Sequence, residues 1–174
     1  MTIAIYPGSF DPVTLGHMNM IKRASRCFDK VIVYVGINSA KQCGLFAPEE
    51  RVELLRRCVT RFPNVEVDCS DELLAAYAKR VGAKVLVKGL RAVSDYEYEV
   101  QMALVNRKLN PDLETMFMAS SEKYTYLSST IVKEMARYGA DLAEFIPREI
   151  VDDVNRKMKE REQTMKPCMR KSVR

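Results

Sequence analysis

The sequence lacks several features that would decide its class at once. No window approaches the roughly 18 apolar residues that span a bilayer, and the chain starts with a strand-like segment and a turn, unlike a signal peptide. Neither G-x-G-x-x-G nor G-x-x-x-x-G-K-[ST] occurs, which excludes the dinucleotide fingerprint and the P-loop. We therefore expect a cytoplasmic protein without membrane contact, in which any phosphate site is built another way.

Cysteine and histidine are also sparse. The five cysteines are odd in number and lack the short paired spacings of a zinc or redox site. They are predicted to be reduced thiols, with Cys27 and Cys58 on core-facing helix positions. His17 is the only histidine in the chain, so any histidine chemistry must take place there.

Positive charge is concentrated near the C-terminus. The 174 residues carry a net charge of +5, but residues 156–174 alone hold eight Lys or Arg and two Glu, which leaves −1 on the rest. A basic tail on a near-neutral body is more often a solvated extension than a recognition surface, so we expect no nucleic-acid partner. We expect one domain over residues 1–159 and a basic, frayed tail over 160–174.

Strand and helix patterns alternate along the chain. Short apolar runs predict five strands, at 2–6, 30–36, 65–69, 84–88 and 114–118. Helical periodicity lies between and after them, at 18–28, 48–59, 73–81, 94–110, 129–138 and 147–159. This alternation predicts an α/β fold, a Rossmann-like, doubly wound, mainly parallel five-stranded sheet in a single domain with C-terminal helices.

Ligands of such sheets bind beyond the carboxyl ends of the strands. The first loop there, residues 7–17, contains Gly8, which we expect to let the backbone approach a ligand, and Ser9, which offers a hydroxyl and an N–H. Gly16 and His17 fall at a helix start, where free N–H groups and the helix dipole favour phosphate. An isolated histidine is usually a capping or packing residue, but this position favours a functional one.

Other loops leave the sheet at the same end. Lys41 follows the second strand, and Lys88 and Arg91 flank a glycine after the fourth, an arrangement suited to oxyanions. Segment 124–130 runs into a helix whose N-cap should be one of the hydroxyl residues 128–130. Each basic residue alone would more often be a solvated surface charge, but phosphate-compatible groups at three strand ends favour a phosphate site.

Four segments carry a family resemblance. Ser-Phe-Asp-Pro-x-Thr-x-Gly-His at 9–17, with Leu-Ser-Ser-Thr at 127–130, resembles the signature pair of the nucleotidylyltransferase superfamily. Thr14, where many relatives carry a first histidine, Lys-Gly-Leu-Arg at 88–91 and Asp-Tyr-Glu-Tyr-Glu at 95–99 are similar to the bacterial phosphopantetheine adenylyltransferase family. The family's activity is transfer of AMP from ATP to 4′-phosphopantetheine, giving dephospho-coenzyme A and pyrophosphate.

The resemblance covers residues 2–158 and implies a Mg²⁺-dependent homohexamer with no metal-ligating side chain of its own. It implies that His17 binds the nucleotide phosphates and stabilises the transition state. The implied acceptor contacts are Ser9, Lys41, Leu74 and Lys88. The implied ATP contacts are Ser9, Phe10, His17, Gly89, Leu90, Arg91, Glu99, Tyr124, Thr125, Tyr126, Leu127, Ser128, Ser129 and Thr130. The chain departs from the family pattern in having Ser9 for a common Thr and Lys88 for a common Arg, which keeps charge but loses the bidentate fork.

The residue inventory fits such a reaction. A substrate phosphate is already a nucleophile, so the protein needs only to align two polyanions and offset the charge of the transition state. Asp11 and Glu99 lie on different loops and do not form an acid–base pair; Asp11 is predicted to stabilise its turn. The lack of a dense carboxylate cluster fits Mg²⁺ held mainly by substrate phosphates and water.

Two alternatives stay open at this point. A sister nucleotidylyltransferase could act on nicotinate mononucleotide or a phosphoglycerol, although Thr14 and the 88–91 loop speak against it. A nucleotide-binding module without catalysis would be expected to have lost His17, which is present.

Overall fold

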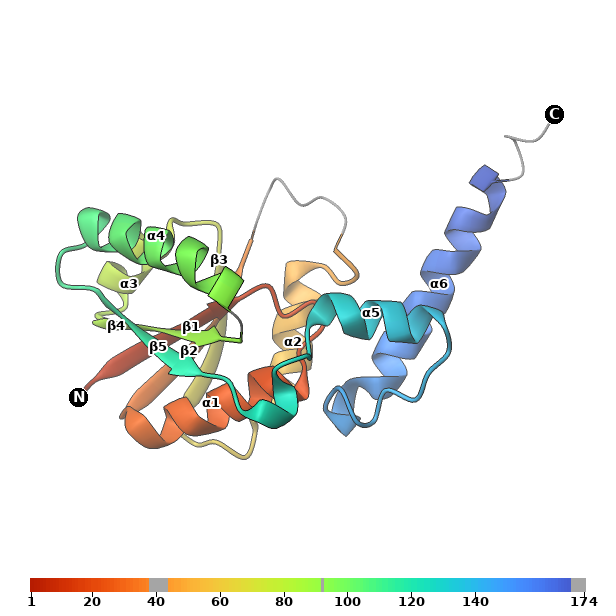
Figure 1. Ribbon diagram of the computed structural model, residues 1–174, viewed down its shortest axis with the longest axis horizontal. Coiled ribbons are helices and arrows are strands. Elements are labelled where there is room, and N and C mark those ends of the chain that lie inside the picture. Colours follow the sequence, from red (N-terminus) through yellow and green to blue (C-terminus); the bar gives the residue numbers. More distant parts are fainter. Residues whose placement is uncertain (38–43, 92, 170–174) are drawn as a thin grey trace.

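One parallel sheet forms the centre of the molecule. The computed structural model describes residues 1–37, 44–91 and 93–169. The strand order is β3-β2-β1-β4-β5, and every neighbouring pair is parallel (Figure 1). The strands are β1 (Ile3–Gly8), β2 (Lys30–Gly36), β3 (Val65–Ser70), β4 (Val85–Leu90) and β5 (Glu114–Ala119). The predicted doubly wound α/β sheet is therefore confirmed, and all five strands are parallel.

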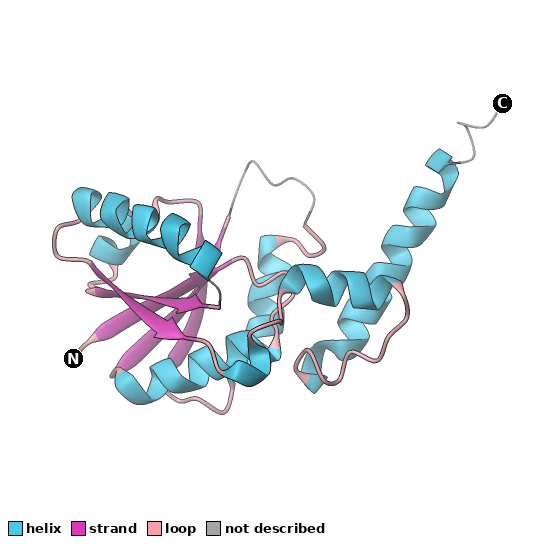
Figure 2. Cartoon of the chain, viewed as in Figure 1, coloured by secondary structure: helices cyan, strands magenta, loops and turns pink. Residues whose placement is uncertain are grey.

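Helices cover both faces of the sheet (Figure 2). They are α1 (Leu15–Cys27), α2 (Pro48–Val59), α3 (Leu74–Arg80), α4 (Val93–Leu109), α5 (Ser129–Arg137) and α6 (Val151–Met169), with single 3₁₀ turns at η1 (Glu122–Tyr124) and η2 (Arg148–Ile150). Within the part of the chain that the structure describes, no helix has the length and apolar character needed to cross a membrane.

The period-two alternation of the strands divides the core into two clusters. Ala4 and Tyr6 of β1 point into the larger cluster, which α1, α2, α5 and α6 complete. Ile5 points to the opposite face, where Tyr77 of α3 and Leu86 of β4 form a smaller cluster. The central strand is thus buried on both sides, which explains its continuous apolar sequence.

The winding direction reverses at β1. The chain moves outward from β1 to β2 and β3, then returns to place β4 on the other side of β1 and β5 beyond it. A crevice opens beyond the carboxyl ends of the strands at such a switch point. The loops after β1 and β4 therefore meet at one place.

Two helix ends and the exposure of one cysteine differ from the predictions. α4 begins at Val93, one residue before the predicted start at residue 94. α3 ends at Arg80, and Gly82 follows with φ 69, the left-handed conformation expected of a terminating glycine. Cys58 is buried as predicted, but Cys27 is exposed because Phe28, the next residue, packs against the core in its place.

The last helix is longer than predicted. α6 continues to Met169, although frayed chain was expected from residue 160, and Figure 1 shows its C-terminal end projecting away from the sheet. Glu, Arg, Gln, Met and Lys in this stretch have high helix propensity, which an argument from apolar periodicity does not count. The division of the chain at residue 159 stays a prediction.

Candidate active site

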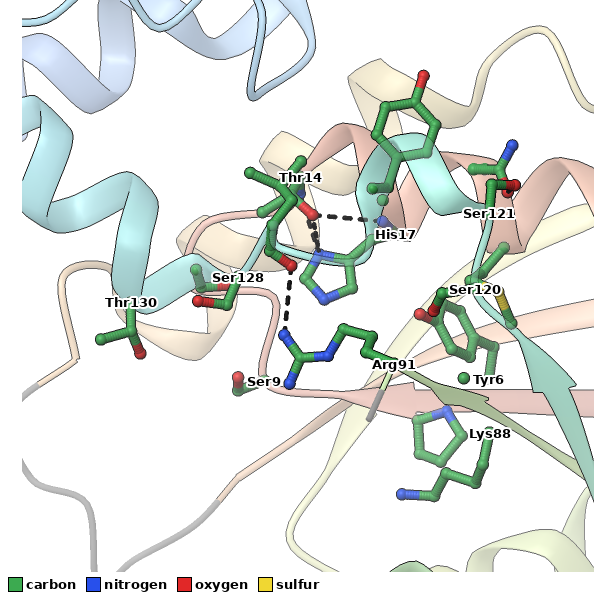
Figure 3. A pocket seen from close by; sticks show the side chains of 18 of the residues that line it. Tyr6, Ser9, Thr14, His17, Lys88, Arg91, Ser120, Ser121, Ser128 and Thr130 are labelled. Carbon is green, nitrogen blue, oxygen red and sulfur yellow. Dashed lines mark hydrogen bonds between the residues drawn. The ribbon is translucent and has the colours of Figure 1, made fainter. Parts of the chain in front are cut away.

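The site begins at the first turn of α1. Thr14 is the N-cap, and its hydroxyl oxygen accepts a hydrogen bond from the backbone N–H of His17 at 3.3 Å. In return, the backbone N–H of Thr14 donates to Nδ1 of His17 at 3.0 Å. The Nδ1 lone pair is thereby occupied, so the neutral imidazole carries its proton on Nε2. Figure 3 shows this second nitrogen pointing away from Thr14, toward Arg91.

The surroundings of His17 keep it neutral. Its ring lies edge-to-face with the ring of Phe10, with centroids 5.1 Å apart. Burial, and then the positive charge of Arg91, lower the pKa of His17 from its usual 6.5 to about 4. At pH 7 the residue is therefore an uncharged N–H donor.

A cavity of about 280 Å³ lies in front of this histidine. Its walls come from the loop after β1 and the first turns of α1, from the end of β4 with α4, and from the segment between β5 and α5. Three strand ends, those of β1, β4 and β5, thus contribute to one space (Figure 3). The sequence predicted the contributions of β1 and β4, whereas Lys41, predicted from the loop after β2, lies outside the described residues.

The β4 side of the cavity carries the charges. Nζ of Lys88 lies 3.0 Å from Oε2 of Glu99, and both side chains are 21% exposed. The Arg91 guanidinium donates to the carbonyl oxygen of Leu127 at 3.2 Å, and its Nε lies 3.4 Å from Oδ2 of Asp95. Two cations therefore face the cavity while paired with carboxylates that a substrate anion can replace.

The N-terminus of α5 forms another wall. Ser128 is the N-cap, with its hydroxyl oxygen accepting from the backbone N–H of Ile131 at 3.2 Å. The hydroxyl of Ser129 donates to the carbonyl oxygen of Pro12 at 2.8 Å, which ties α5 to the first loop. Two helix N-termini, of α1 and α5, thus border the same cavity and favour negative charge there.

Asp11 ties the first loop to more distant segments. Its buried carboxylate accepts from the backbone N–H groups of Leu45 and Phe46, both at 2.9 Å. Nζ of Lys133 on α5 lies 3.2 Å away, and Nε of Arg51 on α2 lies 3.5 Å away. The predicted local turn role is too narrow, because these partners are all far away in sequence.

Comparisons with known proteins show the family of this chain. The family model described as Cytidylyltransferase-like matches residues 5–135. The phosphopantetheine adenylyltransferase of Caldanaerobacter subterraneus subsp. tengcongensis is 55% identical over 159 residues, which is 91% of this chain and 99% of the relative. That of Clostridium tetani is 52% identical over 157 residues, covering 90% and 98%. The chain belongs to the phosphopantetheine adenylyltransferase family.

The likeness in structure reaches beyond this family. Plasmodium falciparum nicotinic acid mononucleotide adenylyltransferase, solved in complex with NaAD, superposes with a TM-score of 0.63 over 87% of this chain and 93% of that one. The identity is 13%, so the comparison shows a shared fold alone.

Most residues that the family resemblance implied are brought together. Those that line the cavity are Ser9, His17, Lys88, Gly89, Arg91, Glu99, Tyr124, Leu127, Ser128, Ser129 and Thr130. Those that the structure places outside its lining are Phe10, Leu74, Leu90, Thr125 and Tyr126. Lys41 lies outside the described residues.

Three of the residues that do not line the cavity pack in the core or are exposed to solvent. Phe10 is 1% exposed and belongs to the large core cluster. Leu74 packs against the smaller cluster, and Tyr126 is 59% exposed. The side chains of Phe10, Leu74 and Tyr126 therefore do not line the cavity.

The cavity also contains residues that sequence reasoning missed. Ser120 and Ser121 follow β5 directly, and Ser121 donates to Oδ1 of Asn19 at 2.9 Å. The carboxyl-end rule that selected the other loops would have found both serines, had it been applied to β5. Tyr6 and Asn19 gave no such signal, because each looks like one more position in a strand or helix.

Proposed function

We propose that this member of the phosphopantetheine adenylyltransferase family transfers the adenylyl group of ATP to 4′-phosphopantetheine, giving dephospho-coenzyme A and pyrophosphate. The observation that carries the proposal is the cavity itself: it joins a neutral histidine donor, two cations and two helix N-termini at three strand ends. Both substrates are polyanions, and these are the groups that hold phosphates.

The reaction needs no nucleophile from the protein. An oxygen of the acceptor phosphate attacks the α-phosphorus of ATP, the new P–O bond forms, and the bond to the bridging oxygen of pyrophosphate breaks. The Nε2–H of His17 donates to an α-phosphate oxygen as negative charge grows there. A donor fixed in place before the reaction stabilises that charge without reorganisation.

The two cations serve different substrates in this proposal. Lys88 binds the acceptor phosphate, which displaces the carboxylate of Glu99 from its ammonium group. Arg91, anchored on Leu127, and the N-terminus of α5 hold the phosphates of ATP. The acceptor phosphate and the α-phosphate are then aligned between them, with His17 at the reacting centre.

We also propose Mg²⁺ as a cofactor bound by substrate. The described residues contain no group of three or more His, Cys, Asp or Glu side chains that could cage an ion. Mg²⁺ does not need such a group of side chains, because it keeps several waters and takes phosphate oxygens of the substrates as ligands. The ion supplies positive charge to the phosphates when bound.

A homohexamer in the cytoplasm completes the proposal. Large apolar side chains are exposed on α4 and the edge strand β5: Tyr98 at 64%, Leu104 at 63%, Leu109 at 55% and Met116 at 50%. Exposed large apolar side chains beyond scattered single ones are typical of protein interfaces, so α4 and β5 are the surface that we propose for subunit contacts. Leu104→Lys should lower the molar mass measured by light scattering, whereas Tyr138→Lys, at the 79% exposed end of α5, should not.

The deciding experiment is a turnover assay with ATP, Mg²⁺ and a panel of phosphorylated acceptors. We expect pyrophosphate release to be fastest with 4′-phosphopantetheine, with dephospho-coenzyme A as the other product. A higher kcat/KM for nicotinate mononucleotide would show that the acceptor is assigned wrongly.

A further inference from the structure

Phe10 stands in the middle of the functional loop, yet its side chain does not touch the cavity. It is 1% exposed, and its φ of 46 lies in the left-handed region, which is uncommon for any residue other than glycine. Such a conformation persists only where the surroundings hold it, and it concentrates at functional sites. This backbone conformation turns the Phe10 ring inward, away from the cavity.

The ring lies between two other aromatic rings. Its centroid is 5.1 Å from that of His17 with an interplanar angle of 71°, and 5.5 Å from that of Tyr6 with an angle of 69°. Both contacts are edge-to-face, within the 4.5–7 Å range that aromatic pairs prefer. The ring therefore fixes where the imidazole lies and covers part of its surface.

Gly8 provides the space for this arrangement. A Cβ at Gly8 would lie 2.8 Å from Cζ of Phe10, closer than real Cβ atoms come to other heavy atoms. Gly8 belongs to β1 and has no left-handed backbone that would itself require glycine. The sequence suggested that this glycine admits a ligand; the structure shows that it admits the Phe10 ring.

We propose that Phe10 is the positioning residue for His17: its ring orients the imidazole and keeps water from it, so that Nε2 faces the substrates. Thr14 holds Nδ1 and Phe10 holds the ring, and together they leave one orientation. The charged group that acts on the imidazole is Arg91, across the cavity; Lys88 and Glu99 share the cavity and are paired with each other.

Burial is the main cause that lowers the pKa of His17 to about 4, and the Phe10 ring supplies part of that burial. The kinetic consequence rests on the proposed adenylyl transfer, because it assumes that His17 acts in the transition state. The effect on the histidine itself does not depend on any activity, so the two can be tested apart.

The test uses nuclear magnetic resonance of the full chain. His17 is the only histidine, so one Hε1 signal reports its titration without assignment by mutation. We expect the wild type to titrate near 4, with its proton on Nε2. Phe10→Leu should raise the pKa by about one unit or more toward the ordinary value of about 6.5. It should also lower kcat about 10- to 100-fold, since an error of ~1 Å in position costs about that much.

Matched variants separate positioning from general damage. Phe62→Leu makes the same change in a partly buried phenylalanine just before β3, at the opposite end of the sheet, and should leave both the titration and kcat unchanged. Gly8→Ala adds one methyl group that pushes the ring, and should shift the His17 titration in the same direction as Phe10→Leu. The two changes should be non-additive in the double variant, because they act through one ring.

Each outcome decides the proposal. An unchanged His17 titration and kcat in folded Phe10→Leu would overturn it, as would full additivity with Gly8→Ala. If Phe10→Leu does not fold, measurements on the wild-type protein still test the proposal. A His17 titration near 6.5 and no NOE between the Phe10 and His17 rings would refute the contact. Lack of turnover with 4′-phosphopantetheine would refute the proposed function and leave the titration result standing.

Discussion

The two sides of the cavity differ in how they hold their functional groups. On the β1–α1 side, His17 is neutral and fixed by Thr14 and Phe10. On the β4–α4 side, Lys88 is charged and one-fifth exposed, and its partner is another side chain that can swing away. A rigid neutral donor suits a charge that appears only in the transition state, whereas an exchangeable ion pair suits binding and release. The comparison predicts effects on kcat from one side and on KM from the other.

The largest effect is expected from His17→Ala. Loss of one preorganised donor typically costs about 10²–10³ in rate, so kcat should fall by that factor and KM should change little. The fold should survive, because loss of a capping interaction costs only about 1 kcal/mol. Steady-state kinetics and a melting curve on the same preparation measure both. A folded variant with near-normal kcat would remove His17 from the mechanism.

Lys88→Ala should act on KM for the acceptor and not on kcat. A hydrogen bond to a charged group contributes about 1.5–3 kcal/mol, so the acceptor KM should rise about 10- to 100-fold while the ATP KM stays nearly constant. Lys88→Arg is the matched control, and it should keep or lower the acceptor KM because the guanidinium can bind phosphate with two parallel bonds. If Lys88→Ala lowers kcat as strongly as His17→Ala does, the two sides do not divide their roles in this way.

The lowered pKa of His17 should make the free energy of unfolding depend on pH. Its pKa is about 4 in the folded chain and should be about 6.5 when unfolded. Between these values the unfolded chain binds more protons, so stability is complete above pH ~6.5 and falls as the pH drops toward ~4. The loss is at most about 3 kcal/mol.

Urea unfolding at both ends of that range measures this loss. His17→Gln should reduce the pH dependence by the histidine's share, while the carboxylates contribute equally in both proteins. Equal pH dependence in the two proteins would mean that the folded histidine titrates normally.

The smallest effect is expected far from both sides of the cavity. Among the α6 side chains that the structure describes, Met158 is the last that is buried. Removal of residues 162–174 should therefore change the free energy of unfolding by less than about 0.5 kcal/mol and leave kcat and both KM values as they are. A drop of several degrees in Tm would show that this end of the helix packs on something.

Much of the fold was predictable because local patterns decided it. The five apolar runs, Pro48 in the first turn of α2 and Gly82 after α3 are signals within a few residues, and the structure has each of them. The C-terminal end of α6 could not be predicted, because the charged residues beyond 159 have no apolar face that indicates a helix. Exposed Cys27 was missed because the next residue, rather than the periodicity, decided which side chain packs.

The site was predictable where groups follow strands and less so elsewhere. Lys88 near the end of β4 and Arg91 just after it lie where the carboxyl-end rule placed them. Residues 128–130 lie at the helix start that their hydroxyl groups predicted. The inward turn of Phe10 could not be foreseen, because a left-handed φ at a non-glycine residue leaves no trace in composition. The partners of Asp11 are also invisible locally, since Leu45 and Lys133 meet it only when three segments fold together.

The position of β1 in the centre of the sheet has a consequence for a growing chain. β2 can pair with one edge of β1 as soon as residue 36 has emerged, but the other edge waits for β4, which ends at residue 90. Until then the apolar strand Ile3–Gly8 presents unpaired backbone groups to other chains, and such an edge promotes association. Among the three strands that finally have two neighbours, the one on which the two halves of the sheet meet is thus also the one that synthesis leaves half-paired for longest.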